Sequence, residues 1–381
     1  MKVRKLIRKS RNLFFRVMYY IFYLLPLEDK ILFTSESREE ISGNLEYIYN
    51  ELISRGKRVE IQFNFRDKKT NPPTIIKFIH LAYQCATSRF IIIDDYYPRL
   101  YKLKIKKNAN FMQVWHAVGA FKQFGYARLG LPGGPTSKAV SHQNYTQVVV
   151  SSQNVVDIYA KSFGVSSDIV LPLGVARTDY FFDIGLMCKS RQDFLGKYPE
   201  LKEKKIIMFA PTFRGVGQMS AYYPIEWIDL SSIYKSIKDT DYVFGIKLHP
   251  YVKDRIKIPK EMRTKIIDFS DYREINDLLI MSDKLITDYS SSIFEYSLLN
   301  RKIIFYAPDL EEYKENRSFY FNYEEFIPGN VYSDFKVVIE EMLNNDFDRD
   351  RLIKFKNSFF EYEDGKSSNR IVDYILEKIG E

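Results

Sequence analysis

The sequence has few of the residues from which many metal and redox centres are built. Its 381 residues include two cysteines and four histidines, and Cys85 and Cys188 lie far apart, with no CxxC pair. This cysteine usage disfavours a disulfide framework and is typical of a reducing, cytoplasmic setting. Walker, HExxH and GxGxxG motifs are also absent. We therefore expect no bound metal and no cofactor.

A hydrophobic run long enough to cross a membrane is also absent. The most apolar stretch, residues 13–25, contains Arg16 and is shorter than the roughly 20 residues that a spanning helix needs. Seven Lys or Arg residues precede the first acid, Glu28. We expect residues 1–27 to form a basic amphipathic helix on the anionic cytoplasmic face of the plasma membrane. The alternative is a buried first helix whose basic start is solvated.

The rest of the chain is close to neutral, because 57 Lys and Arg stand against 49 Asp and Glu and the excess is concentrated at the start. A nucleic-acid binder usually carries basic residues across its folded face, so no nucleic-acid partner is expected. A basic module that binds membranes or nucleic acid without catalysis remains the non-enzyme alternative.

Apolar segments alternate with helical patterns along two series. Strands are predicted near 31–34, 58–65, 90–94, 111–115 and 148–152, then near 206–210, 242–248, 266–269, 284–287 and 303–306. This alternation predicts two doubly wound parallel α/β sheets joined near 172–204. The expected domains are 28–172 and 173–355, followed by C-terminal helices in 356–381.

The stretch after the predicted strand 284–287 is the most informative of the chain. Ser290, Ser291 and Ser292 stand between that strand and a helical pattern, so their hydroxyls and the helix N–H groups suit a phosphate. One of these serines could instead only cap the helix. Glu295 has capping-box spacing, and its functional alternative is to accept hydrogen bonds from a ribose diol.

Other candidates also follow predicted strands. His116 can accept a proton, Gly119 permits close approach to a ligand, and Lys122 can neutralise phosphate. Lys247 and His249 would share a strand face and bind phosphate, if the strand extends that far. Arg214 could hold a phosphate through two nitrogens, although each of these residues could also be structural.

These motifs together resemble the CDP-glycerol:polyol glycerophosphotransferases of wall teichoic acid synthesis. The resemblance covers most of residues 31–335. It rests on Trp-His-Ala-Val-Gly-Ala-Phe-Lys at 115–122, Ala-Pro-Thr-Phe-Arg at 210–214, Lys-Leu-His-Pro at 247–250 and Thr-Asp-Tyr-Ser-Ser at 287–291, with further motifs through 329.

The resemblance implies a GT-B architecture, in which two Rossmann-like domains enclose a cleft, on a peripheral membrane enzyme. It implies CDP-glycerol as donor, an undecaprenyl-diphosphate-linked saccharide as acceptor, and a primase-like role. His116 would be the base and His249 a pyrophosphate contact. Arg214, Ser290 and Ser291 would bind phosphate, and we include Thr287 and Asp288 of the same motif among the substrate-binding candidates.

Three alternatives remain open. The donor could be CDP-ribitol, because both donors present the same CDP half. The acceptor could belong to a capsule polysaccharide, because capsule-decorating relatives share the core. The chain could also be a GT-B glycosyltransferase that uses a nucleotide sugar.

Overall fold

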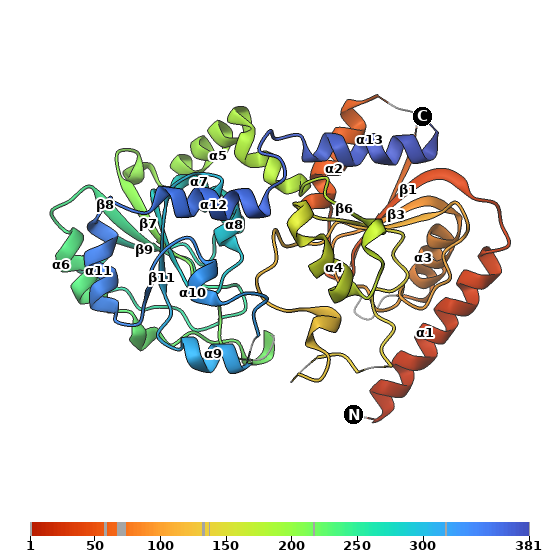
Figure 1. Ribbon diagram of the computed structural model, residues 1–381, viewed down its shortest axis with the longest axis horizontal. Helices are drawn as coiled ribbons and strands as arrows, with labels where there is room; N and C mark the ends of the chain where they lie inside the picture. Colours follow the sequence, from red (N-terminus) through yellow and green to blue (C-terminus); the bar gives the residue numbers. More distant parts are fainter. Residues whose placement is uncertain are drawn as a thin grey trace. The chain divides into compact units, whose positions relative to one another are not determined.

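The computed structural model describes residues 2–56, 59–66, 74–131, 134–136, 138–215, 218–316 and 318–380. Some predictions concern residues that lie outside this description. They are Met1, Arg58 and the side chains of Lys2, Arg4, Lys5 and Arg8. The chain divides into two compact units, residues 1–179 with 360–381 and residues 180–359. The two units are described separately below (Figure 1).

The first unit is built on six parallel strands in the order β2-β1-β3-β4-β5-β6. The strand order reverses between β1 and β3, and ligands of such sheets bind where the order reverses, at the carboxyl ends of the strands. The strands are β1 (Glu28–Thr34), β2 (Glu60–Asn64), β3 (Ser88–Ile93), β4 (Asn110–Gln113), β5 (Gln147–Val149) and β6 (Val170–Leu171). The helices are α1 (Lys2–Phe22), α2 (Asn44–Ser54), α3 (Ile75–Thr87), α4 (Val156–Phe163) and α13 (Ser367–Ile379).

The second unit has six parallel strands in the order β12-β11-β10-β7-β8-β9. This is the order of dinucleotide-binding folds, and it reverses between β7 and β10. The strands are β7 (Lys205–Phe209), β8 (Tyr242–Ile246), β9 (Ile266–Asp268), β10 (Lys284–Thr287), β11 (Lys302–Tyr306) and β12 (Val331–Tyr332). The helices are α5 (Ile184–Lys197), α6 (Leu230–Ile237), α7 (Ile275–Met281), α8 (Ser292–Ser297), α9 (Leu310–Asn316), α10 (Tyr323–Phe326), α11 (Phe335–Leu343) and α12 (Arg349–Phe359).

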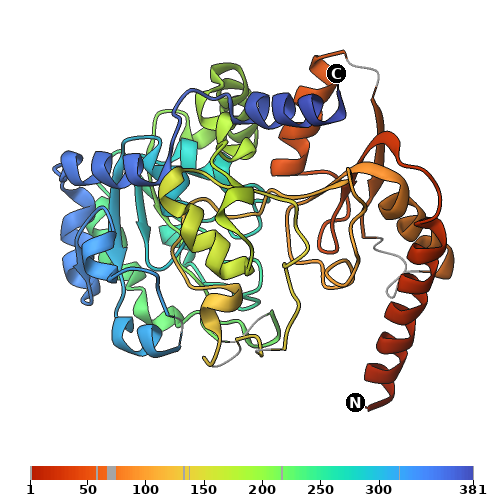
Figure 2. The same cartoon turned by 45° about the vertical axis from the view of Figure 1, so that its right-hand side comes forward.

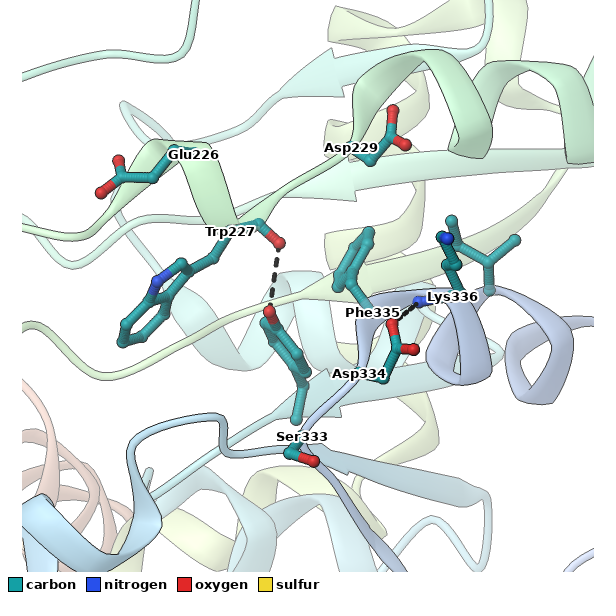
Figure 3. Close-up of a pocket in the computed structure, with 9 residues that line it drawn as sticks. Glu226, Trp227, Asp229, Ser333, Asp334, Phe335 and Lys336 are labelled. Carbon is teal, nitrogen blue, oxygen red and sulfur yellow. Dashed lines mark hydrogen bonds between the residues drawn. The ribbon is translucent and has the colours of Figure 1, made fainter.

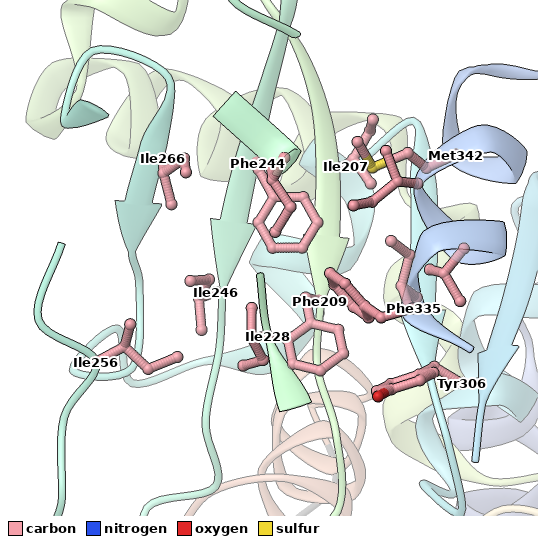
Figure 4. Packing of buried hydrophobic residues seen from close by; sticks show 14 of the residues in the cluster. Ile207, Phe209, Ile228, Phe244, Ile246, Ile256, Ile266, Tyr306, Phe335 and Met342 are labelled. Atoms are coloured by element: carbon pink, nitrogen blue, oxygen red, sulfur yellow. The ribbon is translucent and has the colours of Figure 1, made fainter. Parts of the chain in front are cut away.

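The predicted pair of doubly wound parallel α/β domains is confirmed. Central strands such as β11 are buried along their whole length, because helices cover both faces of a parallel sheet. Figure 4 shows one face of the second sheet, where Phe209 and Phe244 stack with ring centroids 6.0 Å apart. Phe335 of α11 closes this layer by packing edge-on against Phe209.

The C-terminal segment is shared between the units. We expected residues 356–381 to form a set of helices of their own. In the structure α12 stays with the second unit, where Phe355 stacks on Phe294 of α8. Helix α13 packs on α2 in the first unit, and its Ile371 and Ile375 are buried in that unit's core.

The basic first helix uses one of its faces for packing. Helix α1 lies beside α3 (Figure 2). Its Phe15 and Tyr19 are buried, and Phe15 meets Phe78 of α3 edge-on, with ring centroids 6.3 Å apart. Other apolar side chains of α1 and its C-terminal extension are exposed, namely those of Ile7, Phe14, Val17, Ile21 and Leu24. One face of α1 is therefore buried, as in the alternative of a packed first helix, and the opposite apolar face is in contact with solvent. Across the described ranges, no helix has the length and apolar character needed to cross a membrane.

Candidate active site

Each unit gathers predicted site residues at the carboxyl edge of its own sheet. In the first unit these are His116, Gly119 and Lys122, which follow β4. In the second unit they lie at the end of β10 or follow β7, β8 and β10, and they are Arg214, Lys247, His249, Thr287, Asp288, Ser290, Ser291, Ser292 and Glu295.

His116 has the geometry of a proton acceptor. Its Nδ1 lies 3.3 Å from the main-chain oxygen of Asp94 and 3.4 Å from Oδ1 of Asp95. Because both oxygens accept hydrogen bonds, the neutral ring carries its hydrogen on Nδ1 and keeps a lone pair on Nε2. Burial lowers the pKa of His116 below its ordinary value, against the Asp95 carboxylate, which raises it. The side chain is still 45% exposed, so a substrate can reach it.

The carboxylate of Asp94 fixes the loop that faces His116. It is fully buried and forms an ion pair with Nε of Arg38, while Nη1 of Arg38 donates to Ser42 Oγ at 2.7 Å. Burial raises the pKa of Asp94, whereas the Arg38 guanidinium lowers it. The pair joins the loops that follow β1 and β3, where the strand order of the first sheet reverses.

The backbone of the His116 turn is unusual. Trp115 has a φ of 48°, a conformation that a bulky residue rarely adopts and that needs support from its surroundings. That support comes from Asn44, whose Nδ2 donates to the carbonyls of Val114 at 3.2 Å and Trp115 at 2.7 Å. Asn44 was not among the site residues predicted from the sequence.

The glycine of this loop has a backbone reason for its identity. Gly119 has a φ of 64°, which costs glycine little and other residues more, and its carbonyl accepts from Tyr159 Oη at 2.8 Å. Lys122 is half-buried in the same loop. Contacts of both residues with substrate stay predictions.

In the second unit, Asp288 ties together the loops where the strand order reverses. Its Oδ1 accepts from the N–H of Thr212 at 2.7 Å and its Oδ2 from Nη1 of Arg214 at 2.7 Å. Thr287 reinforces this junction by donating from Oγ1 to the carbonyl of Ala210 at 2.7 Å. Both Thr287 and Asp288 are fully buried. These contacts indicate that the two residues position the loops, and their predicted contact with substrate stays a prediction.

Arg214 is engaged by carboxylates on both sides. Its Nε and Nη2 donate to the two oxygens of Asp309 at 2.7 and 2.8 Å, while Nη1 donates to Asp288. Only 6% of the residue is exposed. Burial alone would lower the pKa of Arg214, but the two carboxylates outweigh it and raise the pKa. This geometry fits a positioning role, and the predicted direct contact with phosphate would require these bonds to open.

Lys247 and His249 do not share a strand face, because β8 ends at Ile246. The Nζ of Lys247 turns inward and donates to the carbonyls of Ser270 at 2.9 Å and Tyr272 at 2.5 Å. Burial lowers the pKa of Lys247. His249 accepts through Nδ1 from the N–H of Tyr251 at 3.1 Å, so its hydrogen lies on Nε2. His249 therefore suits a phosphate oxygen as a hydrogen-bond donor, whereas Lys247 supports the neighbouring loop.

The serine run lies at the start of α8, as predicted, and Ser292 is the first residue of that helix. Ser290 Oγ lies 2.8 Å from Ser292 Oγ and accepts from the N–H of Ser292 at 3.3 Å. Ser291 occupies the N-cap position and makes no side-chain capping bond. All three serines are half-buried, so their hydroxyls can still reach a ligand. Glu295 is 3% exposed, and its predicted ribose contact stays a prediction.

A further hollow of about 440 Å³ lies at the carboxyl ends of β11 and β12 (Figure 3). Tyr306 and Phe335 line it, and their rings meet edge-on at 4.9 Å. Its exposed charged side chains are Glu226, Asp229, Asp334 and Lys336. Because acids outnumber bases there, the hollow disfavours a phosphate group. None of these residues was among the predicted site residues. Within the described ranges, no group of three or more His, Cys, Asp or Glu side chains could hold a metal ion.

Comparison with known proteins gives this geometry a family context. The chain is 43% identical over 376 residues to a teichoic acid poly(ribitol-phosphate) polymerase of Bacillus spizizenii, covering 98% of this chain and 61% of the relative. The chain thus spans less than two thirds of that protein. It is 36% identical over 363 residues to the teichoic acid ribitol-phosphate primase of the same organism, covering 92% of each.

A solved structure and a family model agree with these relatives. The structure of a variant of the wall teichoic acid polymerase TagF matches with a TM-score of 0.80 over 99% of this chain and 97% of the other. At 23% identity this match shows the GT-B-like fold alone. Residues 17–377 match the family model described as CDP-glycerol:poly(glycerophosphate) glycerophosphotransferase. The chain therefore belongs to the CDP-glycerol:poly(glycerophosphate) glycerophosphotransferase family, as its motifs predicted.

Proposed function

We propose that this chain transfers a polyol phosphate from a CDP-activated polyol to a hydroxyl group of a teichoic acid acceptor and releases CMP. The observation that carries the proposal is the neutral imidazole of His116, with its Nε2 lone pair at the carboxyl edge of the first sheet. In a member of this family, such a group is suited to activate a hydroxyl nucleophile.

The reaction is a displacement at the β-phosphorus of the donor. The acceptor oxygen forms a bond to this phosphorus, and the bond to the bridging oxygen breaks, so that this oxygen leaves with CMP. The hydroxyl proton passes to Nε2 of His116. Hydrogen bonds from Nε2–H of His249 and from the Ser290 and Ser292 hydroxyls meet the charge on the phosphoryl oxygens. Arg214 and Asp288 hold the serine loop in place for this task.

The proposal also concerns which polyol the CDP-activated donor carries. CDP-glycerol is the predicted donor, and the family description names it. Both curated relatives compared above are ribitol-phosphate enzymes, at 43% and 36% identity. We therefore infer that CDP-ribitol is the first donor to test and CDP-glycerol the second.

The acceptor is proposed to be an undecaprenyl-diphosphate-linked saccharide, to which the chain adds a first unit as a primase does. The match over 92% of both chains to a ribitol-phosphate primase supports this assignment. The higher identity to a ribitol-phosphate polymerase supports repeated addition instead. Counting the polyol phosphates added to each acceptor distinguishes the two.

The test is CMP release from CDP-ribitol and CDP-glycerol, each with and without the lipid-linked disaccharide. We expect release that depends on acceptor, at one equivalent per acceptor for a primase and many for a polymerase. His116→Gln should lower turnover by about 10²–10⁴-fold while donor affinity is kept, because only a positioned base is lost. The exposed His80→Gln is the matched control. No release from either donor, or normal turnover in His116→Gln, would overturn the proposal.

We also propose that the exposed face of α1 binds the anionic inner surface of the plasma membrane. Apolar residues Phe14, Val17 and Ile21 lie on the face that does not contact α3, and Lys9 of the same helix is exposed. An apolar stripe flanked by basic residues suits the boundary between headgroups and acyl chains. Such binding would bring the site to a lipid-linked acceptor.

Deleting the helix would be a poor test, since Phe15 and Tyr19 are buried against the rest of the unit. The double substitution Val17→Glu and Ile21→Glu leaves that packing intact. We expect it to abolish co-sedimentation with phosphatidylglycerol vesicles at low salt. Ile184→Glu, at a residue that is 73% exposed on α5, is the control and should bind as the unmodified chain does. Equal sedimentation of all three proteins would contradict membrane binding through α1.

A further inference from the structure

The side chain of Asn44 joins two segments that lie far apart in the sequence. Its Nδ2 donates to the carbonyls of Val114 and Trp115, directly before His116. Its Oδ1 accepts from the N–H of Arg177 at 2.9 Å, and only 2% of the residue is exposed. One amide therefore fixes the turn that carries His116 and the segment that carries Arg177.

Arg177 follows β6 and His116 follows β4, so both leave the same carboxyl edge of the first sheet. The Arg177 side chain is half-buried. Its charge is close enough to the imidazole to lower the pKa of His116, in the same direction as burial. The opposing groups are the Asp95 carboxylate and Asp94, which raise that pKa. One cation and two acidic residues therefore act on the pKa of His116 in opposite directions.

We propose that Asn44 is a positioning residue that holds Arg177 beside His116. The Arg177 guanidinium then binds an oxygen of the transferred phosphoryl group. The hydroxyl that His116 activates attacks the phosphorus of that same group. The assignment rests on the proposed function. A guanidinium at this place would meet charge that develops on the phosphoryl oxygens, where a fixed donor is most effective. The same cation would keep the imidazole neutral and ready to accept the proton.

Holding both segments requires a side chain at position 44 that donates and also accepts hydrogen bonds. Alanine would remove the donors to the Val114 and Trp115 carbonyls and the acceptor for the Arg177 N–H together. The turn at Trp115, with its φ of 48°, would then lose its two side-chain hydrogen bonds from α2.

The direct test is the titration of His116 followed by NMR of the histidine rings. The chain has four histidines, and His116→Asn identifies the His116 signal by its loss. Arg177→Gln should move the midpoint of His116 to higher pH. Arg89→Gln removes the same charge at the opposite, amino-terminal edge of the sheet, where Arg89 pairs with Asp29, and should leave the midpoint unchanged. Asn44→Ala should also move it to higher pH, because Arg177 is no longer held beside the ring.

Turnover supplies the second readout. Arg177→Gln should lower kcat by about 10- to 100-fold, the loss typical of a charge-assisted hydrogen bond, with partial recovery in Arg177→Lys. An unmoved His116 midpoint in Arg177→Gln overturns the placement, and unchanged kcat overturns the phosphoryl contact. The titration needs no substrate. It therefore decides the placement even if the unmodified chain releases no CMP, a result that would contradict the proposed function separately.

Discussion

The two site histidines carry their hydrogens on opposite ring nitrogens. His116 directs Nδ1 at oxygen acceptors, which leaves a lone pair on Nε2. His249 accepts the Tyr251 N–H at Nδ1, which leaves a hydrogen on Nε2. The same side chain is thus prepared as a proton acceptor in one unit and as a hydrogen-bond donor in the other. The backbone and carboxylate groups around each ring set this difference.

The pH dependence of turnover tests the role of His116. A base must be unprotonated, so kcat should fall as the pH drops through the pKa of His116. Asp95 raises that pKa. Asp95→Asn should therefore lower it and move the acidic limb of the kcat profile to lower pH, while the amide oxygen can still accept from the Tyr96 N–H.

Asp29→Asn is the control for this shift, because Asp29 lies at the amino-terminal edge of the same sheet. Its profile should match that of the unmodified enzyme. A limb that moves to higher pH in Asp95→Asn, or does not move, would contradict the assignment of His116 as the titrating base.

Because Arg214 is buried between two carboxylates, its substitution should change the free energy of unfolding. Arg214→Gln leaves the Asp288 and Asp309 carboxylates without their cation, and breaking a buried pair in this way typically costs about 3–5 kcal/mol of unfolding free energy. Urea unfolding measures the loss. Arg255→Gln breaks an exposed pair with Asp271 and should change little. If Arg214→Gln unfolds like the control but loses donor affinity, Arg214 contacts phosphate directly.

At the scale of elements, the loop between β10 and α8 combines short-range and long-range signals. The serine run after a strand was visible in the sequence, and the structure places it at the N-terminus of α8. The residues that hold this loop were not visible as a network, because Arg214 lies 74 positions from Asp288 and 95 from Asp309. A sequence pattern shows which residues follow strands, but it does not show which of them face one another after folding.

The serine loop is expected to bind the donor through its hydroxyls. Ser290→Ala removes the Oγ that contacts Ser292, and it should raise the Kd for the CDP-polyol about 10-fold, as expected for a lost hydrogen bond to a charged group. Isothermal titration calorimetry measures this Kd. Ser297→Ala, at the other end of α8, is the control, since its Oγ donates to the carbonyl of Phe294. Equal affinities in both variants would exclude the hydroxyl contact.

Short elements and bent strand ends were the hardest to predict. The two-residue strands β6 and β12 are too brief to show an alternating or apolar pattern. The pattern placed Trp115 and Lys247 inside strands, but β4 ends at Gln113 and β8 at Ile246. At both places the chain leaves the sheet shortly before a histidine, His116 or His249. The apolar pattern therefore extends past the end of the strand into residues of the candidate site.

At the scale of the whole molecule, the fold class followed from the alternation of buried strands and helices. The assignment of chain segments to the two units did not follow from this alternation, because the C-terminal helix α13 packs on α2 in the first unit. An amphipathic helix shows that it needs a partner but not which sheet provides it. The same limit applies to α1, whose two faces have different surroundings.

Acid stability provides a test of the first unit's packing. Burial lowers the pKa of His142 to about 4, below its ordinary value near 6.5. The unfolded state therefore binds this proton first. The unfolding free energy should fall by about 1.4 kcal/mol per pH unit from this group as pH drops from roughly 6.5 toward 4. His142→Asn, which tolerates the φ of 66° at this position, should show a shallower fall in urea unfolding.

The exposed His80→Asn is the control, and its stability should follow the steeper pH dependence of the unmodified chain. Identical slopes for His142→Asn and His80→Asn over this range would show that His142 does not contribute to acid sensitivity.

The most direct test of the central claim uses donors labelled at a single phosphorus. CDP-ribitol and CDP-glycerol carrying ³²P at either the α- or the β-position are incubated with the lipid-linked disaccharide. The account predicts that β-label appears in the lipid-linked product and α-label in CMP, with the preferred donor giving the faster transfer. Recovery of both phosphorus atoms in a released nucleoside diphosphate would contradict attack at the β-phosphorus and would indicate transfer of the polyol without its phosphate.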